Sequence, residues 1–138
     1  MPEQKDKAKY FLGVDYGTAK VGLAIADSET RIAFAYGVLR NDENFLEKLL
    51  EIIRKEKIEI VIIGVPKRVK DKKVKYAGEK LGEKLEKEKI SVVYQDEIYS
   101  TKIARENLKE KGLHNINRFD DEESARIILH SFLQKKAL

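Results

Sequence analysis

Three acidic residues stand at the ends of predicted secondary structure elements, where they could share one site. Asp15 ends an apolar run before a Gly-rich turn, Glu97 follows another apolar run, and Asp121 precedes apolar residues at helical spacing. Three carboxylates brought together would repel one another unless divalent cations lay between them. Two metal ions held by Asp and Glu suit phosphodiester hydrolysis, because one activates the attacking water and the other stabilises the leaving oxygen.

Each of these carboxylates also has a purely structural interpretation. Asp15 could cap its turn through its own backbone, and Glu97 could be a solvated loop residue beside Asp96. Asp121 could cap the helix that follows it, as could its neighbour Asp120, the second choice for the site. The sequence leaves both interpretations open for each residue taken singly.

The composition restricts which ligands a metal could have. The chain has 138 residues, enough for one domain with its own core, and charged residues make up 38% of it. It contains no cysteine and only two histidines, which excludes disulfides, thiolate sites, a Cys nucleophile and a His-rich metal site. Oxygen ligands favour Mg²⁺ or Mn²⁺. No apolar stretch has the length of a membrane span, and the polar N-terminus lacks a signal peptide pattern, so we expect a cytoplasmic protein.

A basic segment follows the apolar run at residues 58–65. Residues 67–75 read KRVKDKKVK, and the net charge of the chain is +4. Such a segment beside an acidic metal site suits a polyanion whose backbone is held by cations. The alternative is a solvated charge run. The residues expected to bind nucleic acid are Lys20, Lys67, Arg68, Lys70, Lys72 and Lys73, to which Lys75 and Arg118 could add.

Hydrophobic periodicity predicts five strands and four helices. A hairpin at Gly17 and Thr18 links the first two strands, and a short link at residues 28–30 leads to the third. The expected strands are residues 10–15, 20–27, 32–39, 58–65 and 90–94. The first expected helix begins at Asn41 or Asp42 and runs to about residue 57. The second spans residues 73–88 and the third spans residues 100–112. The fourth begins at Asp120 or Asp121 and lies near the C-terminus.

This element order predicts an α/β fold built on one mixed sheet. The strand-helix-strand units make the first, fourth and fifth strands parallel, with right-handed crossovers. The hairpins add the second and third strands as antiparallel neighbours on one edge. We therefore expect a five-stranded sheet with helices on both faces. A charged tail, residues 1–8, precedes a single domain, residues 9–138.

The same topology predicts that the three carboxylates converge. Parallel strands end at one edge of a sheet, and ligands bind just beyond those ends. Asp15 and Glu97 follow two such strands. Asp121 lies on one helical face with Ala125 and Ile128, and should point toward the sheet. Glu122 is four residues before Arg126, a spacing that predicts a surface ion pair.

Four motifs then resemble a known family. VDYGTAKVGLAIAD, the GVP after the fourth strand, DEIYST and DEESARIIL-HSFL are similar to the YqgF/RuvX family of RNase H-like nucleases, over about residues 9–134. The first motif and the strand order also resemble RuvC-type Holliday junction resolvases. The resemblance implies an RNase H-like domain whose active site is Asp15, Glu97 and Asp121, with Mg²⁺ or Mn²⁺ as cofactor. It also implies a nuclease acting on the 5′ end of pre-16S rRNA, in ribosome biogenesis.

The chain departs from the family pattern at Ile98, where the family has an Arg that could contact phosphate, and in its basic segment. Two alternatives within nucleic-acid proteins are a resolvase of branched DNA, which would need a dimer for two symmetric cuts, and a non-catalytic RNA-binding module. The D-x-G-T-x-x-x-G pattern from Asp15 also resembles the phosphate loop of actin-like ATPases and sugar kinases, which need two such domains. We expect a monomer or a weak dimer.

Overall fold

A computed structural model describes residues 8–65, 77–96 and 121–135 of the chain. Residues 1–7 of the predicted N-terminal tail, the helix expected at residues 100–112, Glu97 and the basic segment from Lys67 to Lys75 lie outside these ranges. Within the described ranges, no helix combines the length and apolar character needed to cross a membrane.

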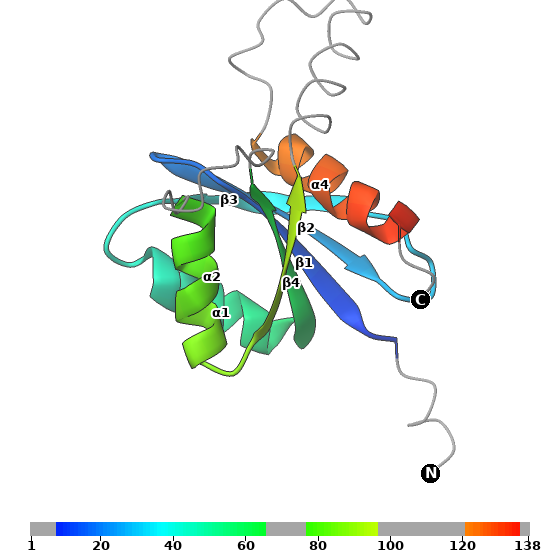
Figure 1. Cartoon of the computed structure of the whole chain (residues 1–138), viewed down its shortest axis with the longest axis horizontal. Helices are drawn as coiled ribbons and strands as arrows, with labels where there is room; N and C mark the ends of the chain where they lie inside the picture. The colour runs from blue at the N-terminus through cyan, green and yellow to red at the C-terminus, as the bar shows by residue number, and fades with distance from the viewer. Residues whose placement is uncertain (1–7, 66–76, 97–120, 136–138) are drawn as a thin grey trace, which may run out of the picture.

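Five strands form one mixed sheet, as predicted (Figure 1). Their order across the sheet is β3-β2-β1-β4-β5. β1 pairs antiparallel with β2 and parallel with β4, and β4 pairs parallel with β5. The strands are β1 (Tyr10–Tyr16), β2 (Lys20–Asp27), β3 (Phe34–Arg40), β4 (Ile58–Val65) and β5 (Ser91–Asp96).

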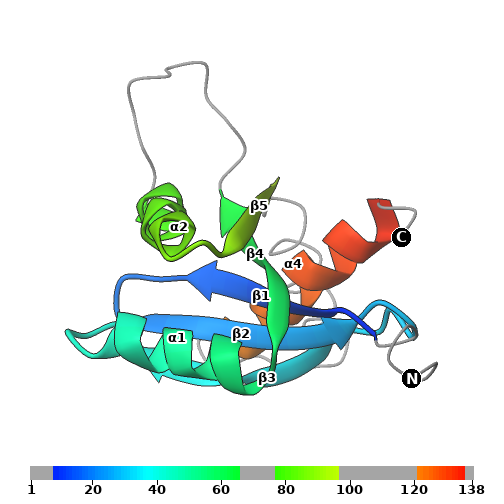
Figure 2. The ribbon, with the colours of Figure 1, turned by 90° about the horizontal axis from the view of Figure 1, so that it is seen from below.

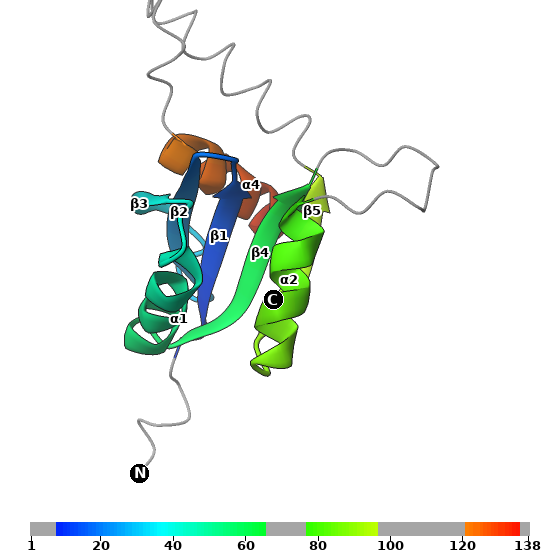
Figure 3. The same cartoon turned by 90° about the vertical axis from the view of Figure 1, so that its left-hand side faces the viewer.

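The described helices cover both faces of this sheet, which confirms the predicted layers. They are α1 (Phe45–Lys55), α2 (Ala77–Lys87) and α4 (Asp121–Lys135). Figure 3 shows α1 and α2 on the near side of the sheet and α4 on the far side, and Figure 2 shows β1, β2 and β3 side by side. The sheet is therefore enclosed between two helical layers.

Strand alternation divides the core into two parts, because successive side chains point to opposite faces. Leu12 and Val14 of β1 belong to the core beneath α1 and α2. Phe11 belongs to the core beneath α4, where its ring centroid lies 6.0 Å from that of Phe132. Each fully buried side chain of this size contributes roughly 1.5–3 kcal/mol relative to exposure.

Several element boundaries differ from the prediction by one or more residues; for example, β5 ends at Asp96 instead of residue 94, and α1 ends at Lys55 instead of about residue 57. β3 begins at Phe34 instead of residue 32, and Ile32 is 53% exposed. α1 begins at Phe45, so neither Asn41 nor Asp42 is its N-cap. Asp42 instead forms a turn before the helix, where its carboxylate accepts the Asn44 N–H at 2.9 Å and its carbonyl accepts the Phe45 N–H at 3.1 Å. Local bonds of an Asp side chain commonly compete with helix in this way.

The predicted ion pair on α4 is also wrong. Arg126 pairs with Glu123, three residues before it, and not with Glu122. Both spacings place side chains on neighbouring parts of a helix surface, so the sequence alone does not choose between them. The Glu123 carboxylate raises the pKa of the Arg126 guanidinium through this hydrogen bond.

Candidate active site at the carboxyl ends of the parallel strands

Asp15 occupies the carboxyl end of β1, one residue before the strand ends. Its Cα is paired with that of Gly22 on β2. Phe11 and Gly13 of the same strand pack against α4, and alternation places Asp15 on their face of the sheet. The side chain is half-buried. Asp15 therefore lies on the α4 side of the sheet, at the edge where ligands of such folds bind.

The packing of α4 on β1 brings the start of the helix toward Asp15. A Cβ on Gly13 would lie 2.8 Å from Leu129 Cβ and 2.9 Å from the Ala125 carbonyl oxygen, so α4 crosses β1 in very close contact here. Because Phe132 contacts Phe11 further back along β1, the helix runs opposite to the strand. Figure 3 shows the first turn of α4 at the same end of the sheet as the end of β1.

The lengths of the two elements agree with this placement. From Gly13 to Asp15 the strand advances roughly 6.6 Å. From Ala125 back to Asp121 the helix advances about 6 Å. From their contact at Gly13, the two elements therefore advance by similar lengths toward the same end of the sheet. The helix begins at Asp121, one of the two starting residues that the sequence predicted.

The face argument for Asp121 over Asp120 is weaker in the structure than in the sequence. The predicted face is confirmed, because Ala125, Ile128 and Phe132 are buried. However, Ser124 is also buried at 5% exposure and Ile127 at 8%. The stripe to which the sequence assigned Asp120 thus faces the protein at these two positions, and Asp120 itself lies outside the described residues. The broad buried surface of α4 leaves both aspartates as candidates, and the choice of Asp121 stays a prediction.

The end of β5 leads to the third predicted carboxylate. β4 and β5 end together, with Val65 paired to Asp96. Gln95 is only 7% exposed and lies on the same face of β5 as Val93, which packs against the α4 core. Glu97 is the next residue of the chain after β5 and lies outside the described residues, as do Lys67, Arg68, Lys70, Lys72 and Lys73.

The turn after Asp15 is closed by hydrogen bonds that the sequence did not predict. The Gly17 N–H donates to the Lys20 carbonyl at 3.0 Å, and a Cβ on Gly17 would lie 2.6 Å from that oxygen. Asn41, predicted as a helix cap, instead donates from Nδ2 to the Gly17 carbonyl at 2.8 Å. Its backbone N–H donates to the Ala19 carbonyl at 2.9 Å. Asn41 therefore joins the end of β3 to the turn beside Asp15.

The donor chemistry of the site fits a hard divalent cation. Among the described residues, no group of three or more His, Cys, Asp or Glu side chains converges. The one predicted ligand whose side chain is described, Asp15, offers carboxylate oxygens, which Mg²⁺ and Mn²⁺ prefer. Lys20 begins β2 on the far side of the turn and is exposed. Of the predicted site residues, the structure thus brings together Asp15, Lys20 and the helix start at Asp121.

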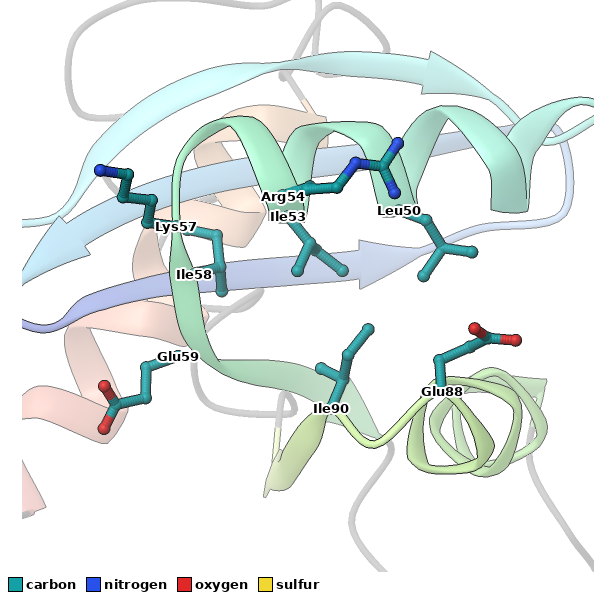
Figure 4. Close-up of a pocket in the computed structure, with 8 residues that line it drawn as sticks. All are labelled: Leu50, Ile53, Arg54, Lys57, Ile58, Glu59, Glu88 and Ile90. Atoms are coloured by element: carbon teal, nitrogen blue, oxygen red, sulfur yellow. The ribbon is translucent and has the colours of Figure 1, made fainter.

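A pocket formed by described residues lies at the other end of the sheet (Figure 4). It has a volume of about 510 Å³ and lies between the end of α1, the start of β4 and the segment that joins α2 to β5. It contains none of the predicted site residues. Its lining is Leu50, Ile53, Arg54, Lys57, Ile58, Glu59, Glu88 and Ile90.

Comparison with known sequences gives one family and many relatives. A family model described as RuvX, Holliday junction resolvase, matches residues 9–135. A protein of Malacoplasma penetrans is 31% identical over 137 residues, covering 91% of this chain and 94% of its own. A protein of Maridesulfovibrio salexigens is 33% identical over 134 residues, covering 90% and 97%. Both carry the name "Putative pre-16S rRNA nuclease".

Comparison with solved structures shows a shared fold. RuvC of Thermus thermophilus, in complex with a Holliday junction substrate, matches with a TM-score of 0.56 at 16% identity, covering 92% of this chain and 94% of its own. The fowlpox virus resolvase, in complex with junction DNA, matches with a TM-score of 0.58 at 12% identity, covering 91% and 97%. These neighbours confirm the predicted RNase H-like fold.

Proposed function

This chain belongs to the RuvX family, and we propose that it is a metal-dependent nuclease that processes the 5′ end of pre-16S rRNA in the cytoplasm. The observation that carries the proposal is the close crossing of α4 over β1 at Gly13, which supports a site where the first turn of α4 and Asp15 lie at the same end of the sheet. The names of the relatives support the substrate, and the RNase H-like fold supports phosphodiester hydrolysis.

In this proposal Asp15, Glu97 and Asp121 hold one or two Mg²⁺ or Mn²⁺ ions. The bound metal supplies an activated water and stabilises charge on the leaving oxygen. Because water would be the attacking group, the chain would need no side-chain nucleophile. Their role is to fix the ions relative to the scissile phosphate, and small displacements of such groups are costly to the rate.

The scaffold is built to hold Asp15 still. Val14, its neighbour, is completely buried beneath α1 and α2, and Gly13 is clamped against α4. The turn that follows is fixed at Gly17 by Asn41. A carboxylate on a strand enclosed by two helical layers loses little conformational freedom on binding a metal, which favours a preorganised site.

The nucleic acid is held in this proposal by cations near the same edge. Lys20 is the first residue of β2, directly after the turn beside Asp15. The basic segment follows β4 in the chain. Its members are Lys67, Arg68, Lys70, Lys72 and Lys73. Contacts of this kind go to phosphates and give affinity without reading the base sequence.

A second candidate function is cleavage of branched DNA. The description of the matching family names a Holliday junction resolvase. A resolvase makes two symmetric cuts, so it would need two sites and hence a dimer. A chain that cuts RNA as a monomer would exclude this activity as the main one.

Cleavage of two labelled substrates tests both candidates. One is an RNA that spans the 16S 5′ leader and the other is a four-way DNA junction, each incubated with Mg²⁺ or Mn²⁺. We expect cutting of the RNA by the wild type, and its loss in Asp15→Asn. Glu51→Gln on the exposed side of α1 removes the same charge far from the site and should cut normally.

Each other outcome has a definite meaning. Paired symmetric cuts in the junction would favour the resolvase. RNA binding without cutting of either substrate by the wild type would favour a non-catalytic RNA-binding module. Unchanged cutting by Asp15→Asn would remove this carboxylate from the mechanism.

A further inference from the structure

Two cationic residues lie directly opposite each other on β2 and β3, at the end of this strand pair that is nearer to Asp15. Lys20 is the first residue of β2 and Arg40 is the last residue of β3, and their Cα atoms are paired in the sheet register. Side chains directly opposite each other in an antiparallel pair have Cβ atoms roughly 4.5–5.5 Å apart. Both side chains are exposed.

The packing of their neighbours shows which face of the sheet carries this pair. Val21 belongs to the core beneath α1 and α2, and Leu39 packs against the same core. Alternation therefore turns Lys20 and Arg40 to the opposite face, which is the α4 face. Asp15 lies on that face too. Its partner in the register, Gly22, is two residues along β2 from Lys20, a distance of roughly 6.6 Å.

The backbone around the pair is fixed. Asn41, the residue after Arg40, bonds to the Ala19 carbonyl through its N–H and to the Gly17 carbonyl through its side chain. The β1–β2 turn and the end of β3 are thus one hydrogen-bonded unit. The backbone at Lys20 and the backbone at Arg40 cannot separate without breaking this unit, so the two side chains leave the sheet from neighbouring positions.

The electrostatic repulsion between these two cations does not favour the fold. Like charges directly opposite each other in a sheet are destabilising. The ion pairs among the described residues join Lys9 to Glu59 and Arg126 to Glu123, and neither involves Lys20 or Arg40. An anion that bridges the two cations would relieve their repulsion.

We propose that Lys20 and Arg40 form a clamp for the sugar–phosphate backbone of the substrate. The clamp binds the part of the nucleic-acid chain that runs from the scissile phosphate at Asp15 toward the β3 edge of the sheet. This inference rests on the proposed function and adds Arg40, which the sequence did not single out. The clamp binds phosphates and reads no base, so it serves RNA and branched DNA alike. Its position on the α4 face sets the direction in which the bound strand leaves the carboxylates.

Binding measured without cleavage tests the clamp separately from the activity. In the Asp15→Asn background, the dissociation constants for the leader RNA and for the four-way junction are measured by fluorescence anisotropy at several salt concentrations between 50 and 200 mM. We expect Arg40→Gln to weaken binding roughly three- to tenfold at low salt. The slope of log K against log salt should fall by about 0.7 for single-stranded RNA, the value for one lost phosphate contact.

Arg54→Gln, an equal loss of charge on α1, is the matched control and should leave both quantities unchanged. Lys20→Gln should resemble Arg40→Gln. The melting temperature of Arg40→Gln should stay the same or rise by up to ~2 °C, because one of two opposed cations is removed. A purely structural role for Arg40 would lower it.

Three results would overturn the clamp. One is equal binding by Arg40→Gln and Arg54→Gln, another is an unchanged salt slope in Arg40→Gln, and the third is absence of binding to both probes with Lys20 and Arg40 intact. If the wild type cuts the leader RNA while Arg40→Gln binds normally, the proposed nuclease stands and the clamp fails. If Arg40→Gln binds the probes more weakly and with a smaller salt dependence, the clamp is supported even where the wild type cuts neither substrate.

Discussion

Gly13 of β1 lies against Leu129 of α4 so closely that a Cβ on residue 13 would come within 2.8 Å of Leu129 Cβ. The Ala125 carbonyl would lie 2.9 Å away on the same side. This contact fixes both the depth and the register of α4 over the strand that carries Asp15. Because residue 13 has no side chain, α4 can pack this closely on β1, and the position of its start at Asp121 depends on this contact.

Gly13→Ala should therefore damage the site more than its size suggests. The new methyl group meets backbone and Cβ atoms, which cannot rotate away, so overpacking should destabilise the fold by about 1–3 kcal/mol. The shift of α4 should also lower cleavage at temperatures where the protein is still folded. Thermal unfolding and RNA cleavage measured on the same samples check both effects.

Gly37→Ala is the control for this substitution, because nothing lies within 4 Å of a Cβ at Gly37. It should retain wild-type stability to within about 0.5 kcal/mol. Normal stability and cleavage in Gly13→Ala would show that the contact with α4 is not what positions the helix.

The sequence predicted the sheet well because its signals are local and strong. The β-branched run at residues 58–65 is β4 exactly as bounded, and the hairpin at Gly17 joins β1 to β2. The predicted start of α1 was wrong because the polar residues before the helix form their own turn, in which the Asp42 carboxylate accepts a hydrogen bond from the Asn44 N–H. Propensity places a cap there, whereas the side chain of Asn41 is taken by the β1–β2 turn.

Arg40 was missed for a different reason. The register between β2 and β3 shifts between Leu23 and Ala24, where Gly37 and Ala35 face them and Tyr36 is the extra residue. Such a bulge moves every later residue to the other face relative to a regular hairpin. Charge can be read from a sequence, but which residue opposes Lys20 depends on this bulge. Glu97 and the basic segment lie outside the described residues and stay predictions.

Asn41→Ala tests whether the turn beside Asp15 needs its cross-strand bond. The substitution removes the donor to the Gly17 carbonyl at 2.8 Å and the acceptor of the Tyr16 hydroxyl at 3.4 Å. We expect a loss of roughly 1–2 kcal/mol of stability, measured by urea unfolding, because partly buried groups lose their partners. Cleavage should fall as the turn loosens.

Asn44→Ala provides the comparison, since Asn44 at the N-cap of α1 makes no capping bond through its side chain. It should cost clearly less stability than Asn41→Ala. Equal losses in the two variants would mean that helix α1, and not the turn, depends on these asparagines.

Alkaline pH should weaken the fold through Tyr36. The Tyr36 hydroxyl donates to the Glu56 carboxylate at 2.7 Å. This bond raises the pKa of Tyr36 above its ordinary value, with smaller contributions from burial and from the charge of Glu56. A pKa raised in the folded state gives stability that is complete below the unfolded pKa of about 10 and is lost as pH rises through the folded pKa.

Melting temperatures between pH 8.5 and 11 check this. The wild type should lose stability over the upper part of the range, and Tyr36→Phe should lose less. Some decline should remain, because burial raises the pKa of Tyr94 in the same direction. Identical pH profiles for the wild type and Tyr36→Phe would contradict the role of the Glu56 bond.

Binding of Mn²⁺ separates the two aspartates at the start of α4. If Asp121 is a ligand, Asp121→Asn should weaken Mn²⁺ binding by more than the ~10–100-fold typical of a lost outer-shell partner, and cleavage should fall in parallel. Asp120→Asn, one residue earlier, removes the same charge and should retain most of both. Calorimetric titration of the folded variants with Mn²⁺ gives the affinities directly. Because Ser124 is buried alongside Ala125, the reverse order is a physical alternative, and a larger loss in Asp120→Asn would move the third ligand to residue 120.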